Sequence, residues 1–576
     1  MTVFHDSQNP VYRSPAGAQP CGTRVRLFLK TDAKAAQVRF WIDGREMLLP
    51  MEVAEGGFSR VFDLPEKPCV VWYYFRVDDD LYYGNAPDNL GGEGALYGHE
   101  PPSYQITVYD PAWKTPDWMG DGIMMQIMVD RFYRGKNTPV RGRFHENWNE
   151  EPYLDIQNNG DNAADDFFGG NLDGIRRKLP YLKDLGVTVL YLNPVFLSPS
   201  NHKYDTSDYM KIDPSFGTLT DLKRLCAEAK SMGIRVMLDG VFSHTGADSV
   251  YFNREKRFPG AGAYHSKRSK YFNWYRFENW PEKYACWWGF DTLPNVDKSS
   301  GSFRDYIIRD GDSVCAHYLR AGISGWRLDV ADELPMDFIA EFRARMKREN
   351  PDAALLGEVW EDPTRKVAYG KLRSYCLGDT LDSAMNYPLR DAILRFLLGR
   401  ITAHACAREI RSLLENMPFQ FARSCMNLLG SHDKPRALAV LADVGDMEPE
   451  RQYRHPLTLT GEEYARGRRR LIAAWNLICA LPGMPCVYYG DEAGLYAMAD
   501  PYCRGTYPWG REDEELQTAF REAIARRRKY AALTKGKTEI FAAGDGVLRV
   551  VRALNGQKIV LTVDRNAENA TWDELS

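Results

Sequence analysis

The chain has 576 residues, 44% of them hydrophobic and 26% charged, and its formal net charge at pH 7 is −4. This length predicts about two to four domains with a large core, and the composition is that of a globular protein. So small a net charge argues against nucleic acid or an anionic membrane as the partner.

The N-terminal residues contain no basic stretch followed by an apolar run, so a secretory signal is not predicted. No segment approaches the roughly 18 uninterrupted apolar residues that a membrane span needs. The 11 cysteines are an odd number without CxxC spacing, which favours free thiols. We therefore expect a cytoplasmic protein.

Residues 1–112 show the pattern of an all-β domain. Short runs that alternate apolar and polar residues, such as 23–29, 37–42 and 70–77, are separated by Asp, Gly, Lys and Pro. This rhythm predicts an N-terminal β-sandwich, and the Pro-rich stretch 100–116 predicts a linker.

From residue 120 onward, apolar β-branched runs alternate with amphipathic helical windows, among them 172–186, 219–232 and 513–530. Eight buried strands are expected, at 124–130, 187–192, 234–239, 325–330, 353–358, 381–386, 425–430 and 484–489. Strands that alternate with helices in this way predict an α/β fold, a closed (β/α)8 TIM barrel rather than an open sheet.

Two features depart from a minimal barrel. Residues 243–300 are long, aromatic and poor in helical periodicity, which predicts a subdomain inserted after the third strand. Residues 534–576 alternate again and predict a small C-terminal β-domain. The barrel with its insertion is therefore expected to span residues 113–533.

The active sites of such barrels lie at the C-terminal ends of the strands. Charged or histidine side chains fall there on four predicted strands: Asp239 and His244, Arg327 and Asp329, Glu358, and His432 and Asp433. Arg327 and Asp329 share one face of their strand, and an arginine beside an aspartate favours its ionised form. That pair alone could be structural, but four such ends at one rim favour an active site.

These stretches resemble the motifs of the α-amylase superfamily of retaining glycoside hydrolases. The matching stretches are Asp239-Gly-Val-Phe-Ser-His244, Gly325-Trp-Arg-Leu-Asp-Val-Ala-Asp-Glu333, Gly357-Glu-Val-Trp360 and Leu429-Gly-Ser-His-Asp433, with Leu293-Pro-Asn-Val-Asp297 as a fifth. Residues 198–205, residues 330–333 and the N-terminal sandwich are most similar to the neopullulanase, cyclomaltodextrinase and maltogenic amylase group. Asp332 and Ser243 stand where that group typically carries Asn, which bears on the subgroup more than on the reaction.

The resemblance implies a glycosidase that cleaves α-1,4-glucosidic bonds in cyclodextrins, maltooligosaccharides, pullulan or starch through a covalent β-glycosyl-aspartate. Asp329 would be the nucleophile, Glu358 the general acid and then the general base, and Asp433 a stabiliser of the transition state. A transglycosylase or an α-1,6-active relative with the same residues remains the alternative. A non-catalytic glucan-binding relative is disfavoured because all three acids are present.

The resemblance also implies a set of substrate-binding residues. Arg327 would align the nucleophile, while His244 and His432 would donate hydrogen bonds to the sugar at the cleavage point. Tyr204 would form a stacking floor under this sugar, although a core tyrosine at a barrel rim is the competing interpretation. Asp239 is either a substrate ligand or a partner of Arg327.

Three further positions are weaker candidates. His202 could be a ligand or an ordinary loop histidine, and Trp360 and Glu333 are expected near the leaving-side sugars. In the sandwich, four aromatic residues could bind glucan chains, although packing or a subunit contact is the favoured use: Trp41, Trp72, Tyr82 and Tyr83.

Relatives often hold a calcium ion between two loops, which correspond here to 134–137 and 169–172. Calcium needs several oxygen ligands, whereas Arg134 and Lys136 bring positive charge to the first loop. We expect no calcium and no other cofactor, unless three nearby acids restore the site: Asp161, Asp165 and Asp166. In relatives the N-terminal sandwich packs on a partner subunit, which implies a homodimer acting on α-glucans.

Overall fold

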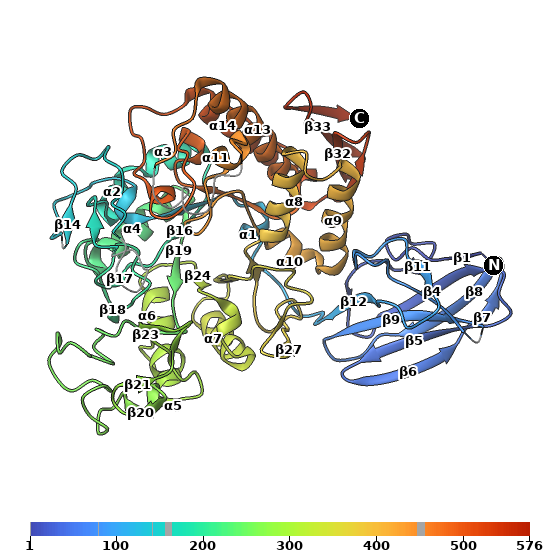
Figure 1. The fold of residues 1–576 in the computed structure, drawn as a ribbon, viewed down its shortest axis with the longest axis horizontal. Coiled ribbons are helices and arrows are strands. Elements are labelled where there is room, and N and C mark those ends of the chain that lie inside the picture. The colour runs from blue at the N-terminus through green and yellow to red at the C-terminus, as the bar shows by residue number, and fades with distance from the viewer. Residues whose placement is uncertain (1, 79, 141, 156–163, 446–455, 576) are drawn as a thin grey trace.

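The computed structural model describes residues 2–78, 80–140, 142–155, 164–445 and 456–575. Figure 1 shows a β-sandwich at the N-terminus lying beside a larger α/β body, with the C-terminal sheet against helices of that body. Within the described residues, no helix has both the length and the apolar character needed to cross a membrane. All 11 cysteines are free thiols, as their spacing predicts.

A parallel eight-stranded sheet forms the centre of the α/β body, in the order β28-β25-β24-β19-β16-β13-β30-β29. Its strands are β13 (Met124–Ile127), β16 (Val189–Leu192), β19 (Arg235–Gly240), β24 (Gly325–Leu328), β25 (Ala354–Gly357), β28 (Ser383–Ala384), β29 (Met426–Leu428) and β30 (Met484–Tyr488). A parallel bridge between Met385 and Met426 joins the two ends of the sheet. Each strand coincides with one predicted run, with β19 extending one residue beyond its run to Gly240, so the TIM barrel is confirmed.

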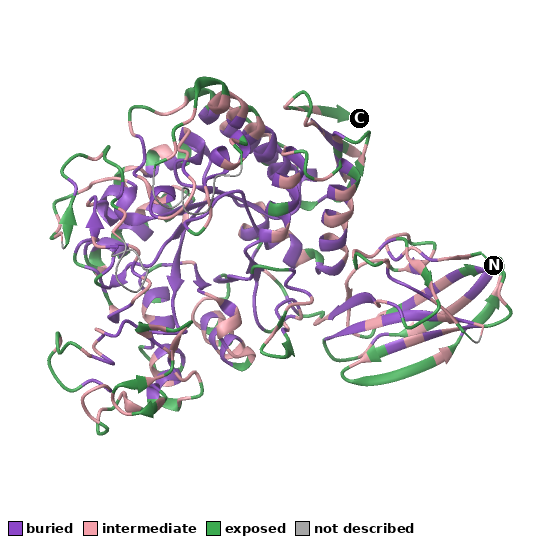
Figure 2. Ribbon diagram, in the orientation of Figure 1, coloured by how far each residue is buried: buried purple, intermediate pink, exposed green. Residues whose placement is uncertain are grey.

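The strand sequences explain why this sheet closes. Every residue of β13, β16, β24 and β25 is buried, as expected for strands covered on both faces. One set of alternate residues fills the barrel interior, including Met124, Val189, Met237 and Leu356. The other set packs against the surrounding helices, and Figure 2 shows the buried centre.

The helices that surround the barrel are α2 (Leu172–Arg177), α3 (Leu179–Leu185), α4 (Leu219–Ser231), α6 (Val314–Arg320), α7 (Met336–Glu349), α8 (Tyr387–Leu397), α9 (Ala403–Asn416), α11 (Ala437–Ala442), α13 (Gly461–Ala480) and α14 (Glu514–Lys529). The prediction of one helix over 172–186 is wrong, because the chain breaks at Lys178 between α2 and α3. Pro180 lacks an N–H and its ring would collide with the carbonyl of Arg176 in a continuous helix.

No helix connects β25 to β28, a stretch that lies wholly within the described residues. A hairpin takes its place, formed by β26 (Val367–Ala368) and β27 (Lys371–Leu372). Short hairpins also make up the inserted segment after β19, namely β20 (Phe277–Asn279) with β21 (Lys283–Tyr284) and β22 (Cys286–Trp287) with β23 (Phe290–Pro294). The low helical periodicity of residues 243–300 predicts such a segment of short hairpins.

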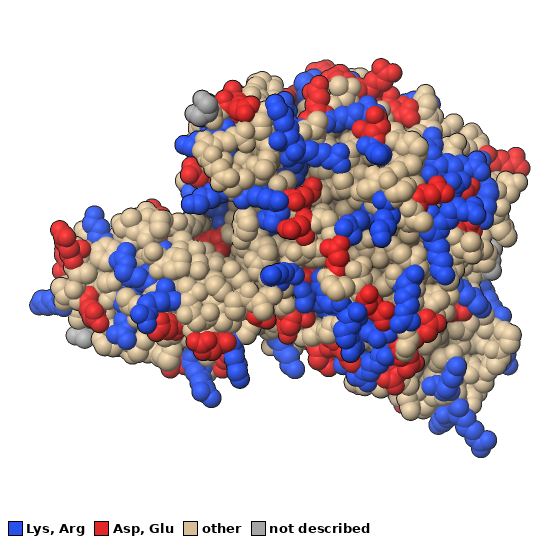
Figure 3. Space-filling model, turned by 180° about the vertical axis from the view of Figure 1, so that it is seen from behind, with Lys and Arg blue, Asp and Glu red and all other residues tan. Residues whose placement is uncertain are grey.

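The N-terminal sandwich consists of two sheets around a separate apolar core. Its longest strands are β4 (Arg24–Thr31) and β8 (Gly57–Asp63) in one sheet, and β5 (Ala36–Ile42), β9 (Cys69–Val77) and β12 (Tyr104–Tyr109) in the other. The C-terminal sheet contains β31 (Lys537–Ala542), β32 (Val547–Leu554), β33 (Gln557–Asp564) and β34 (Asn569–Leu575). On the face seen in Figure 3, acidic and basic side chains are interspersed, so no single-sign field dominates it.

A buried ion pair joins the sandwich to the α/β body. The Arg13 Nη2 lies 2.6 Å from Oε1 of Glu415, near the end of α9, and the Arg13 side chain is fully buried. Arg13 also donates to the backbone carbonyl of Gln105, and Gln8 donates to the second oxygen of Glu415. These contacts attach the sandwich to the barrel helices at one place.

Replacing Glu415 by alanine should lower the free energy of unfolding by about 3–5 kcal/mol, because it leaves a buried guanidinium without its counter-charge. Urea denaturation followed by fluorescence would measure the loss. The exposed pair Arg24–Asp63 provides a control, since solvent screens it and Asp63→Ala should change the free energy of unfolding far less. Equal effects of the two substitutions would contradict this account of the junction.

Candidate active site at the barrel rim

The barrel strands position the polar side chains of the site. Met237 faces the barrel interior, so Asp239, two residues further along β19, faces the same way. Leu356 on β25 is followed by Glu358 in the same manner. Because parallel strands end at one rim, the predicted acids converge there.

The guanidinium of Arg327 lies at the centre of this rim and is fully buried. Its Nη1 lies 2.8 Å from Oδ1 of Asp239 and 2.8 Å from Oδ1 of Asp329. Its Nη2 lies 2.7 Å from Oε2 of Glu358. One cation therefore joins carboxylates that belong to three neighbouring strands, β19, β24 and β25.

Burial dominates the charge state of this cluster. Burial raises the pKa of Asp329 well above its ordinary value; Arg327 opposes the rise, and Glu358 and Asp239 add to it. Burial also raises the pKa of Asp239 against the effect of Arg327. From the sequence we expect Arg327 to keep Asp329 ionised. The structure shows that Arg327 does lower the pKa of Asp329, but that burial raises it by more. Three carboxyl groups around one guanidinium favour retention of a proton in the cluster.

Glu358 is held by three donors. Arg327 and the backbone N–H of Val330 both donate to its Oε2, while the indole N–H of Trp360 donates to its Oε1 at 2.8 Å. Val330 has a φ of 36°, an unfavourable conformation for a β-branched residue, and this conformation turns its N–H toward Glu358. Trp360 itself is stacked on Tyr387, with ring centroids 4.5 Å apart.

A chain of hydrogen bonds fixes the orientation of His432. The side chain of Gln126 donates to Nδ1 of His432 at 2.7 Å, and Nε2 of His432 lies 2.6 Å from the hydroxyl of Tyr204. Tyr204 donates in turn to Asp239. Burial lowers the pKa of His432 well below its ordinary value, so the ring is neutral, and its single proton lies on Nε2.

Sequence reasoning missed two residues of the site, Gln126 and Tyr191. Gln126 donates to His432, and the hydroxyl of Tyr191 donates to Asp239 at 2.6 Å. Both occupy inward positions on predicted strands, and that signal could have identified them. Arg504 was also missed. It donates to the backbone carbonyl of His432 and approaches Asp433 at 3.6 Å. Arg504 lies after the last barrel strand, β30, in a segment whose sequence has no recognisable pattern.

The remaining predicted residues lie further from the carboxylate cluster. His244 and His202 both contact the backbone of Tyr204, His244 at the carbonyl and His202 at the N–H. Asp433 lies 3.1 Å from His432, with 30% of its side chain exposed. Glu333 accepts hydrogen bonds from Tyr369 and Trp288 at the outer rim.

Basic side chains occupy the surroundings of the two loops that correspond to the calcium site of relatives. Arg134 donates to the backbone carbonyls of Phe168, His145 and Glu146, and the ammonium of Lys136 lies 2.6 Å from Asp221. Each of these oxygen atoms near the two loops is therefore bound to a cationic side chain. Asp165 pairs with Arg143 and Asp166 with Arg131, while Asp161 lies outside the described residues.

Burial lowers the pKa of His244 to about 3. The unfolded chain binds a proton at this histidine below its ordinary pKa of about 6.5, whereas the folded chain does not until about pH 3. The histidine therefore makes stability fall as the pH decreases through this range, by about 2 kcal/mol between pH 7 and pH 5.

In the His244→Gln variant, the loss of unfolding free energy between pH 7 and pH 5 should be smaller by that amount. Urea denaturation at the two pH values measures it, and substitution of the exposed His99 by Gln is the control. An unchanged pH dependence in His244→Gln would show that this ring is not buried as a neutral base.

Comparison with known proteins agrees with the geometry of the rim. Residues 126–538 match the family described as alpha amylase, catalytic domain. The chain is 36% identical to an amylopullulanase of Thermoanaerobacter thermohydrosulfuricus over 96% of its own length and 40% of the relative's. It thus spans less than half the length of the amylopullulanases that it matches.

A cyclomaltodextrinase of Geobacillus thermopakistaniensis is 34% identical over 92% of this chain and 84% of its own. Among solved structures, the cyclic α-maltosyl-(1→6)-maltose hydrolase of Arthrobacter globiformis is 30% identical, with a TM-score of 0.66 over 78% of this chain and 92% of that one. The match to the catalytic domain covers the barrel and all the acids at its rim, and the chain therefore belongs to the α-amylase family.

Proposed function

We propose that the protein is a retaining glycoside hydrolase that cleaves α-1,4-glucosidic bonds in cyclodextrins, maltooligosaccharides, pullulan or starch. The observation that carries this proposal is the shared guanidinium of Arg327, whose two terminal nitrogens bind Asp329 and Glu358 from adjacent strands. A nucleophile and an acid/base group must flank one glycosidic bond in such a reaction. The relatives named amylopullulanase and cyclomaltodextrinase support the substrate class.

Asp329 and Glu358 would perform a double displacement. Arg327 holds Oδ1 of Asp329, so Oδ2 is the oxygen that attacks the anomeric carbon while Glu358 gives its proton to the departing glycosidic oxygen. Two N–H donors occupy Oε2 of Glu358, whereas Oε1 accepts only from Trp360 among the described residues and has a lone pair left to carry that proton. Glu358 then takes a proton from water, and the resulting hydroxide displaces Asp329 from the sugar.

Asp433 and His432 would hold the sugar at the cleavage point. Asp433 is partly open to solvent, and the Nε2 proton of His432 lies beside it. A sugar hydroxyl that reaches this edge would donate to Asp433 and would compete with the Tyr204 hydroxyl for the Nε2 proton of His432. The Tyr204 ring lies parallel to the His432 ring, with centroids 5.2 Å apart and an interplanar angle of 3°, which supports its proposed role as the floor of the same subsite.

Glu358→Gln should reduce kcat by at least about 1,000-fold, because it removes the proton donor, and Asp329→Asn should do so by removing the nucleophile. Release of reducing sugar from maltotriose and β-cyclodextrin measures the loss, and unchanged thermal unfolding shows that the fold is intact. Glu361→Gln, at an exposed carboxylate three residues from Glu358, is the matched control. Near-normal activity of Glu358→Gln would refute the assignment.

An α-1,6-active enzyme or a transglycosylase is the second candidate. The Arthrobacter globiformis relative is named for a cyclic substrate that contains a (1→6) bond, and the rim residues proposed here would serve either bond. Products from maltotriose and pullulan separate the cases. Glucose and maltose indicate hydrolysis, products longer than maltotriose indicate transfer, and cleavage of the α-1,6 bonds that join the maltotriose units of pullulan indicates α-1,6 activity.

We also propose that the enzyme needs no calcium or other cofactor, since Arg134 and Lys136 occupy the oxygen atoms around the corresponding loops. Excess EDTA should leave both activity and the thermal midpoint unchanged, and added calcium should raise neither. A fall in the midpoint that calcium reverses would contradict this proposal. Eleven free thiols support a cytoplasmic location, and a homodimer remains the proposed assembly.

A further inference from the structure

The indole of Trp360 is bound directly to the reactive oxygen of the proposed acid/base group. Its N–H donates to Oε1 of Glu358 at 2.8 Å, while Arg327 and the backbone N–H of Val330 both donate to Oε2. A carboxyl oxygen has two lone pairs. Because Trp360 occupies one of them on Oε1, the proton that Glu358 carries lies on the other, and its direction is fixed.

Tyr387 forms the base on which this indole rests. The two rings are nearly parallel, with centroids 4.5 Å apart and an interplanar angle of 10°. Tyr387 is the first residue of α8 and is buried in the barrel interior. Asn386 caps this helix by accepting from the backbone N–H of Leu389. Core packing and a capped helix start therefore hold the tyrosine, and through it one face of the indole.

An ammonium group adds a third contact. Nζ of Lys434 lies 4.1 Å from the ring centroid of Trp360 and 5.7 Å from that of Tyr387, within the distance at which an aromatic face attracts a cation. Lys434 directly follows Asp433 in the segment after β29. The three side chains thus join the segment after β25, which carries Glu358, to the one that carries Asp433.

The same indole could also contact a sugar on the leaving side, as the sequence predicts. Such a contact needs a free ring face, whereas Tyr387 covers one face and the Lys434 ammonium group lies over the ring. Trp360 remains 39% exposed, but its polar atom is already bonded to Glu358. The hydrogen bond to the acid is therefore the specific contact of this residue.

We infer that Trp360 is a positioning residue for Glu358 in both steps of the reaction, and that Tyr387 and Lys434 hold its indole in place. The inference rests on the proposed function for the role of Glu358. In the first step the indole N–H directs the acid proton toward the glycosidic oxygen. In the second step it holds the carboxylate toward the water that attacks the glycosyl-enzyme, through a charge-assisted hydrogen bond.

Trp360→Phe tests the inference, because phenylalanine keeps a ring on Tyr387 but has no N–H. α-Maltosyl fluoride isolates the second step, since fluoride departs with little help from an acid and the probe has no leaving sugar. The variant should lose about tenfold in kcat on both maltotriose and this fluoride, as loss of one hydrogen bond to a carboxylate predicts. A maltosyl group should accumulate on Asp329, which mass spectrometry of the denatured protein detects. Azide attacks without a base and should restore turnover of the fluoride.

Two further sets of variants complete the test. Trp118→Phe is the matched control, because that indole donates to the backbone carbonyl of Asp352 before the first barrel strand, and kcat should stay unchanged on both substrates. Lys434→Met should lose about threefold in kcat, whereas Lys434→Arg, which keeps a cation beside the rings, should retain it. The lysine variants keep the inference testable if Trp360→Phe has a lowered thermal midpoint.

The outcomes separate the inference from the proposed function. If Trp360→Phe raises KM for maltotriose but cleaves α-maltosyl fluoride as the wild type does, the residue contacts the leaving sugar and the inference is wrong. Unchanged kcat on both substrates would also refute it, and in either case the proposed function stands. If Glu358→Gln keeps its activity, the proposed function fails, and the inference fails with it.

Discussion

The guanidinium of Arg327 is the constraint on which the site depends. Burial by itself favours the neutral forms of Asp239 and Asp329, and Arg327 is the cation that opposes it at both while also binding Glu358. Its planar fork fixes the directions of these bonds, which a single ammonium group would not do. The second oxygen of Asp239 then holds Tyr204 and, through it, His432.

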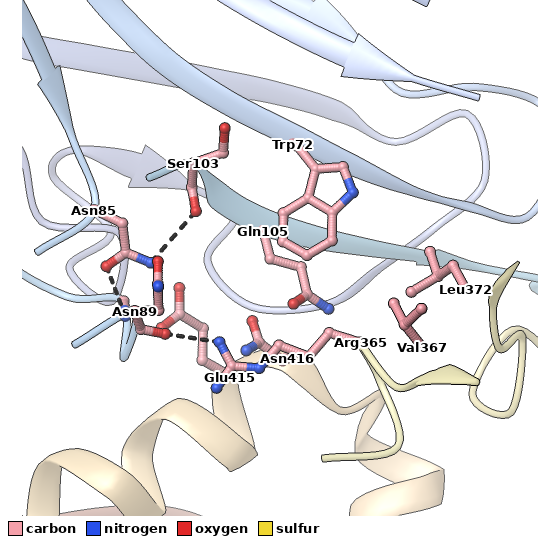
Figure 4. A pocket seen from close by; sticks show the side chains of 11 residues that line it. Trp72, Asn85, Asn89, Ser103, Gln105, Arg365, Val367, Leu372, Glu415 and Asn416 are labelled. Carbon is pink, nitrogen blue, oxygen red and sulfur yellow. Dashed lines mark hydrogen bonds between the residues drawn. The ribbon is translucent and has the colours of Figure 1, made fainter. Parts of the chain in front are cut away.

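The barrel lacks its usual helix between β25 and β28, a fully described stretch next to the rim residues. Glu358 directly follows β25, and the segment after it forms a hairpin instead of a helix. One end of this hairpin contacts Glu333 at the rim, and its strands line a cleft against the sandwich (Figure 4). The strand that precedes Glu358 thus continues into the segment that connects the rim with the N-terminal domain.

Much of the fold could be predicted because each barrel strand is a short apolar run that is buried on both faces. The acids could be predicted as a group because they follow such runs, and parallel strands end at one rim. The break at Lys178 was also encoded locally, in Pro180, but the periodic apolar pattern of 172–186 continues across it. Periodicity reports which face is buried and does not report whether the backbone hydrogen bonds are continuous.

By itself, the sequence determined the barrel, the rim and the identities of the residues there. Only the tertiary structure decided which of them touch. Gln126 reaches His432 across 306 positions, and Lys434 reaches Trp360 because the ends of β25, β28 and β29 adjoin in the closed barrel. Packing likewise decided the pKa of Asp329, which burial raises and Arg327 lowers. The physical reason is that a local pattern sets the strand and the face of a side chain, whereas its partners and its dielectric surroundings come from segments distant in the chain.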